Sequence, residues 1–236
     1  MINLHVHIPG TGEPKDKPID AAEVIRTLTA NDQARVMLKQ MYISYSQVAL
    51  NSGVTTIRTV GGIENYDAWL RDEINSGKVT GPRILASNKA ISVPGGHMAG
   101  VFAYSVTSPE MAREHVRIVA EGKPDLIKLM ITGGVMDADE SGEPALKMSP
   151  EIVKAACDEA HKPGFYVAAH VEGSLGLKVA LENGVDTIEH GARTNEETIR
   201  LFKERGAALV TTISPTIPYA LIDTSVTHFT ETAHTA

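Results

Sequence analysis

The chain has 236 residues, of which 42% are hydrophobic, 22% charged and 5% aromatic, and its formal net charge is -7. This composition is typical of globular domains and excludes disordered and fibrous proteins. Acidic and basic residues are interspersed, whereas a nucleic-acid surface would need clustered Lys and Arg. No stretch approaches the ~18 apolar residues of a bilayer span, and no basic-then-apolar leader opens the chain, so we expect a cytoplasmic protein.

Short runs rich in β-branched residues recur along the chain, each followed by a pattern of helical period. This alternation is typical of βα units with a parallel sheet. Because the first run begins directly after Met1, we expect the chain to be cut from a longer protein. The runs cover residues 2–7, 55–60, 83–92, 126–132, 166–171, 187–190 and 208–214.

Helix boundaries lie between these runs. Ser108-Pro109-Glu110 and Ser149-Pro150-Glu151 each offer a capping hydroxyl, a proline suited to the first turn and a carboxylate at the positive end of the helix dipole. The second of these helices is expected to end at Lys162-Pro163-Gly164. Glycines end the others, at Gly122, Gly184 and Gly206.

Seven strand and helix alternations indicate one α/β domain, either an open doubly wound sheet or a closed barrel. No glycine-rich phosphate-binding motif follows any strand, which favours a TIM-like (β/α)8 barrel. With seven strands visible, we expect an incomplete barrel over residues 1–215 and a tail of uncertain structure over residues 216–236. Cys157, the single cysteine, lies in a helical pattern and is interpreted as a buried structural thiol.

Histidines stand at the ends of several predicted strands, where parallel α/β folds form their active sites. His5 and His7 are two residues apart, which places both side chains on one face of the first strand, and His170 and His190 close two later strands. Imidazoles from separate strands can hold a catalytic metal ion. The alternative is that ordinary hydrogen bonds satisfy each histidine, which is reasonable for one residue and less so for four together.

Lys128 lies inside an apolar run, residues 126–132. If its side chain faces a barrel interior, burial of the ammonium group is costly, and desolvation with nearby cations would lower its pKa. The resulting neutral amine can act as a nucleophile or be modified. The alternative places Lys128 on the helix-facing side, with its stem buried and its head at the rim.

The order His-x-His, strand lysine, His and His resembles the amidohydrolase superfamily of metal-dependent hydrolases. More narrowly, the chain is similar to the imidazolonepropionase-related branch, which includes enzymes that cleave Xaa-Pro and Xaa-Arg dipeptides and N-acyl amino acids. The likeness extends from residue 2 to about residue 219. The segments that carry it are His5-Val-His7, residues 53–62, Gly95-Gly-His97, and residues 127–135, 169–173 and 188–191.

This resemblance implies a site for two divalent metal ions, with zinc as the expected metal. One ion is held by His5 and His7, and the other by His170 and His190. Lys128 bridges them as a carbamate, formed when its neutral amine captures carbon dioxide. A hydroxide held between the metals then attacks an amide or peptide-like C–N bond of a dipeptide or N-acyl amino acid.

Two further residues match substrate contacts of this branch: His97 and Tyr219. Their alternatives are loop hydrogen bonding for His97 and packing against a proline turn for Tyr219. The family's acid/base aspartate, at the end of an eighth strand, is not found, so the catalytic group is unknown. Asp223 is the only aspartate after Asp186, and no family motif surrounds it. The family's small β-sandwich is also missing.

Two rival interpretations stay open. In the first, the chain is a catalytically impaired metal-binding fragment, or an assembly subunit whose missing barrel edge is covered by another chain. In the second, the substrate is a lactone or a cyclic amide, because specificity lies in loops. We expect a small-molecule substrate as the partner, with neither nucleic acid nor membrane, and homo-oligomer formation is left open.

Overall fold

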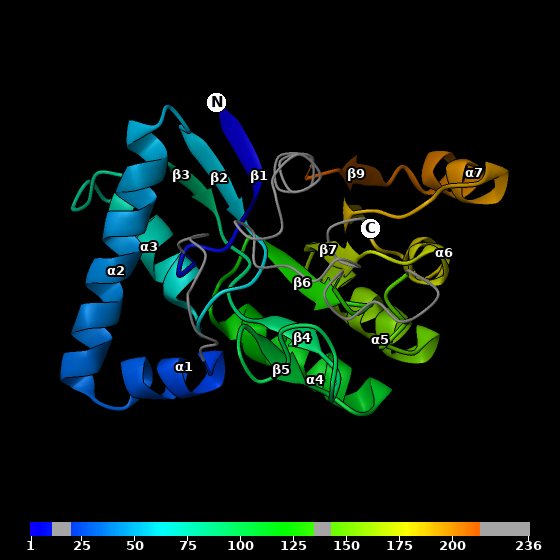
Figure 1. Cartoon of the computed structure of the whole chain (residues 1–236), viewed down its shortest axis with the longest axis horizontal. Helices are drawn as coiled ribbons and strands as arrows, with labels where there is room; N and C mark the ends of the chain where they lie inside the picture. Colours follow the sequence, from blue (N-terminus) through cyan, green and yellow to red (C-terminus); the bar gives the residue numbers. More distant parts are fainter. Residues whose placement is uncertain (11–19, 135–142, 213–236) are drawn as a thin grey trace, which may run out of the picture.

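The computed structural model describes residues 1–10, 20–134 and 143–212. Within these ranges the strands form two sheets, with the helices packed outside them (Figure 1). The strands are β1 (Ile2–Val6), β2 (Thr56–Thr59), β3 (Arg83–Leu85), β4 (Ala90–Ser92), β5 (Ala103–Ser105), β6 (Leu126–Met130), β7 (Tyr166–Val171), β8 (Thr187–His190) and β9 (Ala208–Val210). The helices are α1 (Ala21–Thr29), α2 (Asp32–Asn51), α3 (Tyr66–Asn75), α4 (Pro109–Glu121), α5 (Pro150–His161), α6 (Ser174–Glu182) and α7 (Glu196–Arg205).

All strand pairs in both sheets are parallel. One sheet has the order β1-β2-β3 and the other the order β5-β4-β6-β7-β8-β9. No backbone ladder joins the two sheets in the part of the chain that the structure describes, so the barrel is not closed there. This arrangement confirms the incomplete TIM-like α/β barrel predicted from the sequence.

Strand alternation separates the helix-facing core from the barrel interior. Ile127 and Leu129 of β6 and Ala169 of β7 belong to the large core that these strands form with α4, α5 and α6. The intervening residues, Lys128 and His170, are buried on the opposite face. A second core lies between the three-stranded sheet and α2 and α3. The fold therefore directs the polar residues of β6 and β7 into the barrel.

Several predicted boundaries agree with the structure. The runs 166–171 and 187–190 coincide with β7 and β8. Ser108 caps α4, because its hydroxyl accepts a hydrogen bond from the backbone N–H of Met111 at 3.2 Å. Gly206 ends α7 in the left-handed conformation, with φ 65°. Cys157 is buried, as predicted.

The predicted single strand over residues 83–92 is wrong, and so is the count of seven strands. The run divides into β3 and β4, which belong to different sheets, and β5 is an additional strand. The division occurs at Asn88, whose φ of 58° breaks the extended backbone. Its amide accepts from the N–H of Ala68 and donates to the carbonyl of Gly122, both at 3.0 Å. These distant partners stabilise a break that an apolar run does not reveal.

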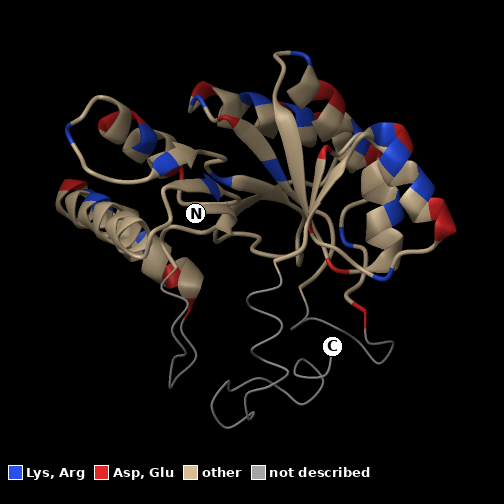
Figure 2. Cartoon of the chain, turned by 90° about the horizontal axis from the view of Figure 1, so that it is seen from above, with Lys and Arg blue, Asp and Glu red and all other residues tan. Residues whose placement is uncertain are grey.

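Acidic and basic residues are interspersed along the outer helices, as the colouring of the ribbon in Figure 2 shows. No helix in the described ranges is long and apolar enough to cross a bilayer. The predicted tail over residues 216–236 lies outside the described residues, and so do Tyr219 and Asp223.

Candidate metal centre

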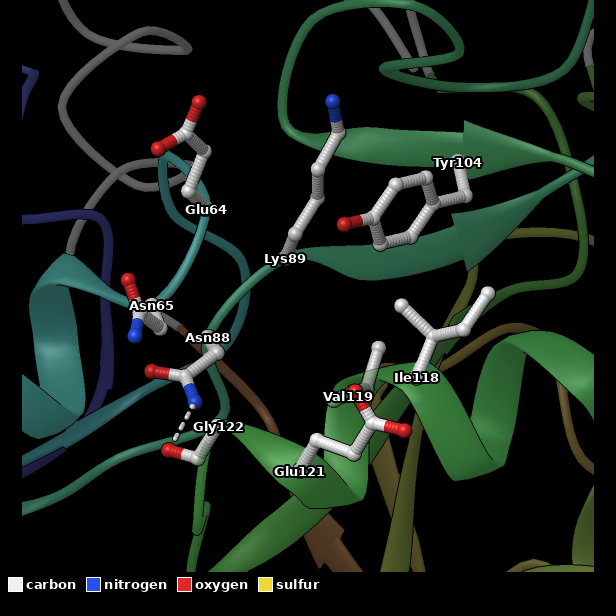
Figure 3. Close-up of a pocket in the computed structure, with 9 residues that line it drawn as sticks. All are labelled: Glu64, Asn65, Asn88, Lys89, Tyr104, Ile118, Val119, Glu121 and Gly122. Carbon is white, nitrogen blue, oxygen red and sulfur yellow. Dashed lines mark hydrogen bonds between the residues drawn. The ribbon is translucent and has the colours of Figure 1, made fainter.

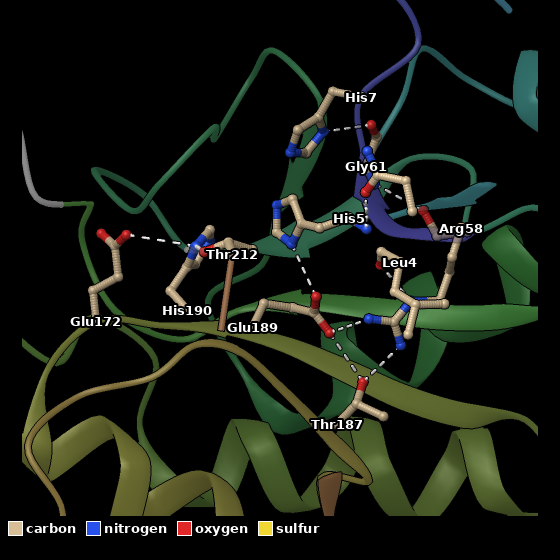
Figure 4. Close-up of polar contacts among 12 residues, drawn as sticks. Leu4, His5, His7, Arg58, Gly61, Glu172, Thr187, Glu189, His190 and Thr212 are labelled. Atoms are coloured by element: carbon tan, nitrogen blue, oxygen red, sulfur yellow. Dashed lines mark hydrogen bonds and ion pairs between the residues drawn. The ribbon is translucent and has the colours of Figure 1, made fainter. Parts of the chain in front are cut away.

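The four strand-end histidines come together in one group, which we call the histidine cluster: His5, His7, His170 and His190. The ring centroid of His5 lies 5.4 Å from that of His7 and 4.6 Å from that of His190, and His170 lies 4.8 Å from His190. Figure 4 shows the His5, His7 and His190 side chains grouped between β1 and β8. The cluster therefore brings together residues of the three-stranded and the six-stranded sheet.

Three of these rings have one nitrogen fixed by an oxygen acceptor. An acceptor requires a proton on the nitrogen that faces it, so the second nitrogen of each neutral ring carries a lone pair. A metal-ligating imidazole has this arrangement. The contacts are His5 Nδ1 to the Glu189 carboxylate at 2.9 Å, His7 Nδ1 to the Gly61 carbonyl at 2.8 Å and His170 Nε2 to the Gly133 carbonyl at 3.0 Å.

His190 reaches the cluster through an unusual backbone conformation. It directly follows Glu189 in β8, and neighbouring residues of a strand normally face opposite sides. His190 has φ 69°, in the left-handed region, and this turns its side chain toward the side that Glu189 occupies. Its Nδ1 lies 2.8 Å from the hydroxyl oxygen of Thr212.

Burial keeps the histidine cluster in its neutral form. Desolvation is the largest cause of a lowered pKa at each of the four rings, and it is reinforced by the positive charges that neighbouring residues would carry. The pKa falls to about 3 for His7 and to about 2 for His190. At neutral pH these imidazoles are therefore available as metal ligands.

Lys128 is buried on the interior face of β6, and its side chain is not at the rim. The residue is 1% exposed, and its Nζ has no hydrogen-bond partner among the described residues. Burial, supported by the charge of Arg58 and opposed by that of Glu189, lowers the pKa of Lys128 to about 7. A substantial share of this amine is therefore neutral at pH 7.

The donors present suit a divalent metal ion. Neutral imidazoles are common ligands of zinc and of other first-row metals. The unpartnered Nζ of Lys128 is a second indication, because a buried amine without a hydrogen bond is costly unless a bound group satisfies it. The histidine cluster and Lys128 therefore fit the kind of metal centre that the sequence resemblance implies.

Glu172 is a neighbour that the sequence analysis did not single out. Its carboxylate oxygens lie 3.7 Å from His170 Nε2 and 3.8 Å from His190 Nδ1. Ligand atoms of these three residues all lie within 4.8 Å of one another, close enough to hold a metal ion. The available signal was a carboxylate two positions after a strand-end histidine.

Glu189 and Arg58 also belong to the site and were not predicted from the sequence. Glu189 is fully buried in β8, and its carboxylate contacts Arg58 of β2 at 2.6 Å (Figure 4). Burial alone would raise the pKa of Glu189, but the His5 hydrogen bond and the charges of Lys128 and Arg58 outweigh it and hold the pKa below its ordinary value. The cluster thus has an ionised carboxylate on one side.

His97, expected to contact substrate, also lies at this site. Its ring stacks on that of His170, with centroids 4.1 Å apart and planes inclined by 6°. The other expected substrate contact, Tyr219, lies outside the described residues. Of the predicted site residues that the structure describes, all are brought together here.

A separate cavity of about 370 Å³ lies away from the histidine cluster (Figure 3). Lys89 and Tyr104 line this cavity, and the Lys89 ammonium lies 4.7 Å from the centre of the Tyr104 ring. Burial lowers the pKa of Lys89. None of its lining residues belongs to the cluster. They are Glu64, Asn65, Asn88, Lys89, Tyr104, Ile118, Val119, Glu121 and Gly122.

Several known proteins are similar to this chain in sequence and in fold. Ochratoxinase of Aspergillus niger is 31% identical over 191 residues, which cover 70% of this chain and 39% of that protein. A Xaa-Pro dipeptidase with methionine bound in its active site has a structure with 31% identity and a TM-score of 0.79, covering 99% of this chain and 58% of the dipeptidase. The structure of A. niger ochratoxinase, at 24% identity, has the same fold, with a TM-score of 0.80 over 99% of this chain and 55% of that one.

The chain spans about half the length of these relatives, from 39% of the ochratoxinase sequence to 58% of the dipeptidase. The family model for the amidohydrolase family matches residues 1–233, nearly the whole sequence. With the arrangement of parallel strands and strand-end histidines already described, this match establishes that the chain belongs to the amidohydrolase family.

Proposed function

We propose that the chain provides the metal-binding part of a hydrolase that cleaves the C–N bond of a dipeptide or an N-acyl amino acid. The observation that carries the proposal is the grouping of the neutral histidine cluster around Lys128, whose buried amine has no hydrogen-bond partner among the described residues. The substrate class is supported by relatives named as an Xaa-Pro dipeptidase and an ochratoxinase.

In this proposal His5 and His7 would hold one divalent ion, and His170 and His190 would hold the second, with zinc as the proposed metal. Lys128 would help to hold both ions as a carbamate, since its neutral amine can capture carbon dioxide and thereby supply anionic oxygens. When bound, the metals would activate water and polarise the substrate carbonyl.

The chain's own residues would position the metal ligands and orient the substrate. His97, stacked on His170, is placed to contact a substrate at the edge of the cluster. The carbonyl oxygens of Gly61 and Gly133 would hold the rings of His7 and His170 in the orientation that a metal ligand needs. The barrel boundary at residue 215, a cytoplasmic location and a role for Tyr219 stay predictions.

Metal analysis tests the proposal directly. The purified chain, incubated with zinc and bicarbonate at neutral pH and dialysed, is expected to retain up to two metal ions, and Xaa-Pro dipeptides and N-acyl amino acids are then assayed for hydrolysis. Zinc content near zero would contradict the metal centre. Bound zinc without hydrolysis would favour the alternative of a metal-binding chain that is catalytically impaired, and hydrolysis of lactones instead would move the substrate class.

A further inference from the structure

Glu189 is a fully buried carboxylate with a defined partner on each oxygen. Oε2 accepts a hydrogen bond from His5 Nδ1 at 2.9 Å. Oε1 accepts from the Arg58 guanidinium at 2.6 Å and from the Thr187 hydroxyl at 3.1 Å. Because both oxygens act as acceptors, the Glu189 contact determines which nitrogen of His5 carries the proton.

Arg58 fixes the orientation of this carboxylate. Its Nε donates to the carbonyl oxygen of Leu4 in β1 at 2.7 Å, and another guanidinium nitrogen donates to Thr187 in β8 at 3.1 Å. The guanidinium therefore contacts strands of both sheets. It can only donate hydrogen bonds, since none of its atoms is an acceptor. Figure 4 shows the arrangement, with Arg58 and Thr187 on one side of Glu189 and His5 on the other.

We infer that Glu189 is a positioning residue that sets the tautomer of His5: its carboxylate holds the proton on Nδ1 and so leaves the Nε2 lone pair directed at the metal centre. The inference rests on the proposed function, because it concerns a proposed metal ligand. A carboxylate behind a ligating histidine fixes the orientation of the ring and increases its basicity.

Replacement of Glu189 by glutamine distinguishes this role from simple packing. The amide has nearly the same shape, but one end now donates. The Arg58 guanidinium can only donate, so the amide oxygen must face it and the amide NH2 must face His5, while the Thr187 hydroxyl can still donate to the same oxygen. His5 would then accept at Nδ1 and carry its proton on Nε2, the nitrogen needed for metal binding.

Long-range 1H–15N correlation spectra of the metal-free chain report the tautomer, with the His5 signals assigned by their loss in His5→Gln. We expect Nδ1–H in the wild type and Nε2–H in Glu189→Gln, together with a ~10- to 100-fold weaker zinc affinity by calorimetry. The control is Glu159→Gln, which removes another carboxylate held by two cations, Arg117 and Lys162, on a helix outside the cluster. It should leave the His5 signals and zinc binding unchanged.

The double variant Arg58→Met/Glu189→Gln provides a second test. It keeps the inference testable even if Glu189→Gln alone folds poorly. Without Arg58 the amide can turn its oxygen toward His5, because the Thr187 hydroxyl can both donate and accept. The Nδ1–H tautomer should then return. An unchanged tautomer in Glu189→Gln, or Nε2–H in the metal-free wild type, would overturn the inference. A wild-type chain that shows Nδ1–H yet binds no zinc would instead contradict the proposed function.

Discussion

The imidazole of His97 lies flat on that of His170, with the ring centroids 4.1 Å apart. His97 belongs to the loop after β4, whereas His170 is buried in β7. A Cβ atom on Gly134 would lie 2.9 Å from His97 Nδ1, so the backbone after β6 also approaches this ring closely. The stack thus joins an accessible loop to a buried strand at the edge of the cluster.

His97→Phe keeps an aromatic ring at this position but removes the two ring nitrogens. Phenylalanine can keep the stack on His170 but cannot hydrogen-bond a substrate, so zinc content should stay at the wild-type level while KM rises by about tenfold, the effect of losing about 1.4 kcal/mol. Zinc analysis and steady-state kinetics check this outcome. A variant with an unchanged KM would remove His97 from the substrate contacts.

Lys128→Ala should lower metal occupancy, because Lys128 is proposed to bridge both ions. The matched control is Lys203→Ala, an exposed lysine on α7. Zinc retained after dialysis is measured for both variants, and only the Lys128 variant should lose it.

Short carboxylates such as acetate provide an independent check of the bridging role. They can occupy the space left in Lys128→Ala and supply oxygens in place of the carbamate. Part of the zinc binding should therefore return as acetate is added. Equal zinc content in Lys128→Ala and the wild type would place Lys128 outside the metal centre.

The histidine cluster and Lys128 could be predicted from the sequence, because the patterns that reveal them are local. Alternation along residues 126–132 and 166–171 predicts which side chains share a face, and the parallel βα pattern predicts that strand ends meet. Those signals lie within single runs of residues.

Contacts between elements that are distant in the chain could not be predicted in this way. The break at Asn88 depends on its bonds to α3 and to the end of α4. The role of Glu189 depends on an arginine 131 positions away in the chain, and the direction of His190 depends on a left-handed φ. Alternation would have placed Thr187 and Glu189 on one face of β8, but it gives no partner for either.

The burial of Asp67 should make the stability of the folded chain depend on pH. Asp67 is buried at the start of α3 beside Gly62, with Tyr42 and Thr59 nearby, and among the described residues neither carboxylate oxygen has a hydrogen bond of ordinary geometry. Burial raises its pKa from 3.8 to about 6. Between these values the unfolded chain releases the proton while the folded chain keeps it, so stability falls as pH rises, by about 3 kcal/mol in all.

Asp67→Asn should remove this loss, since an amide does not titrate. Urea unfolding at pH 4 and pH 7 would show a smaller difference in the free energy of unfolding for the variant than for the wild type. Asp158→Asn serves as the control, because Asp158 is a half-exposed carboxylate on α5. The same pH dependence in Asp67→Asn and the wild type would assign the effect to other groups.

Arg58→Met tests how the buried ion pair contributes to stability. The variant leaves the Glu189 charge buried without its guanidinium partner, which should lower the free energy of unfolding of the metal-free chain by about 3–5 kcal/mol. The control is Arg117→Met: this arginine is largely exposed, so its loss from the pair with Glu159 should matter little. Urea unfolding gives both values.

The double variant Arg58→Met/Glu189→Met decides whether the pair serves stability or function. Two apolar side chains of similar volume remove both buried charges, so the double variant should recover most or all of the wild-type stability. Its zinc affinity should be lower than that of the wild type, because His5 has then lost the acceptor that holds its proton on Nδ1. If stability and zinc affinity recovered together, the pair would not be needed for metal binding, and the positioning role of Glu189 would be contradicted.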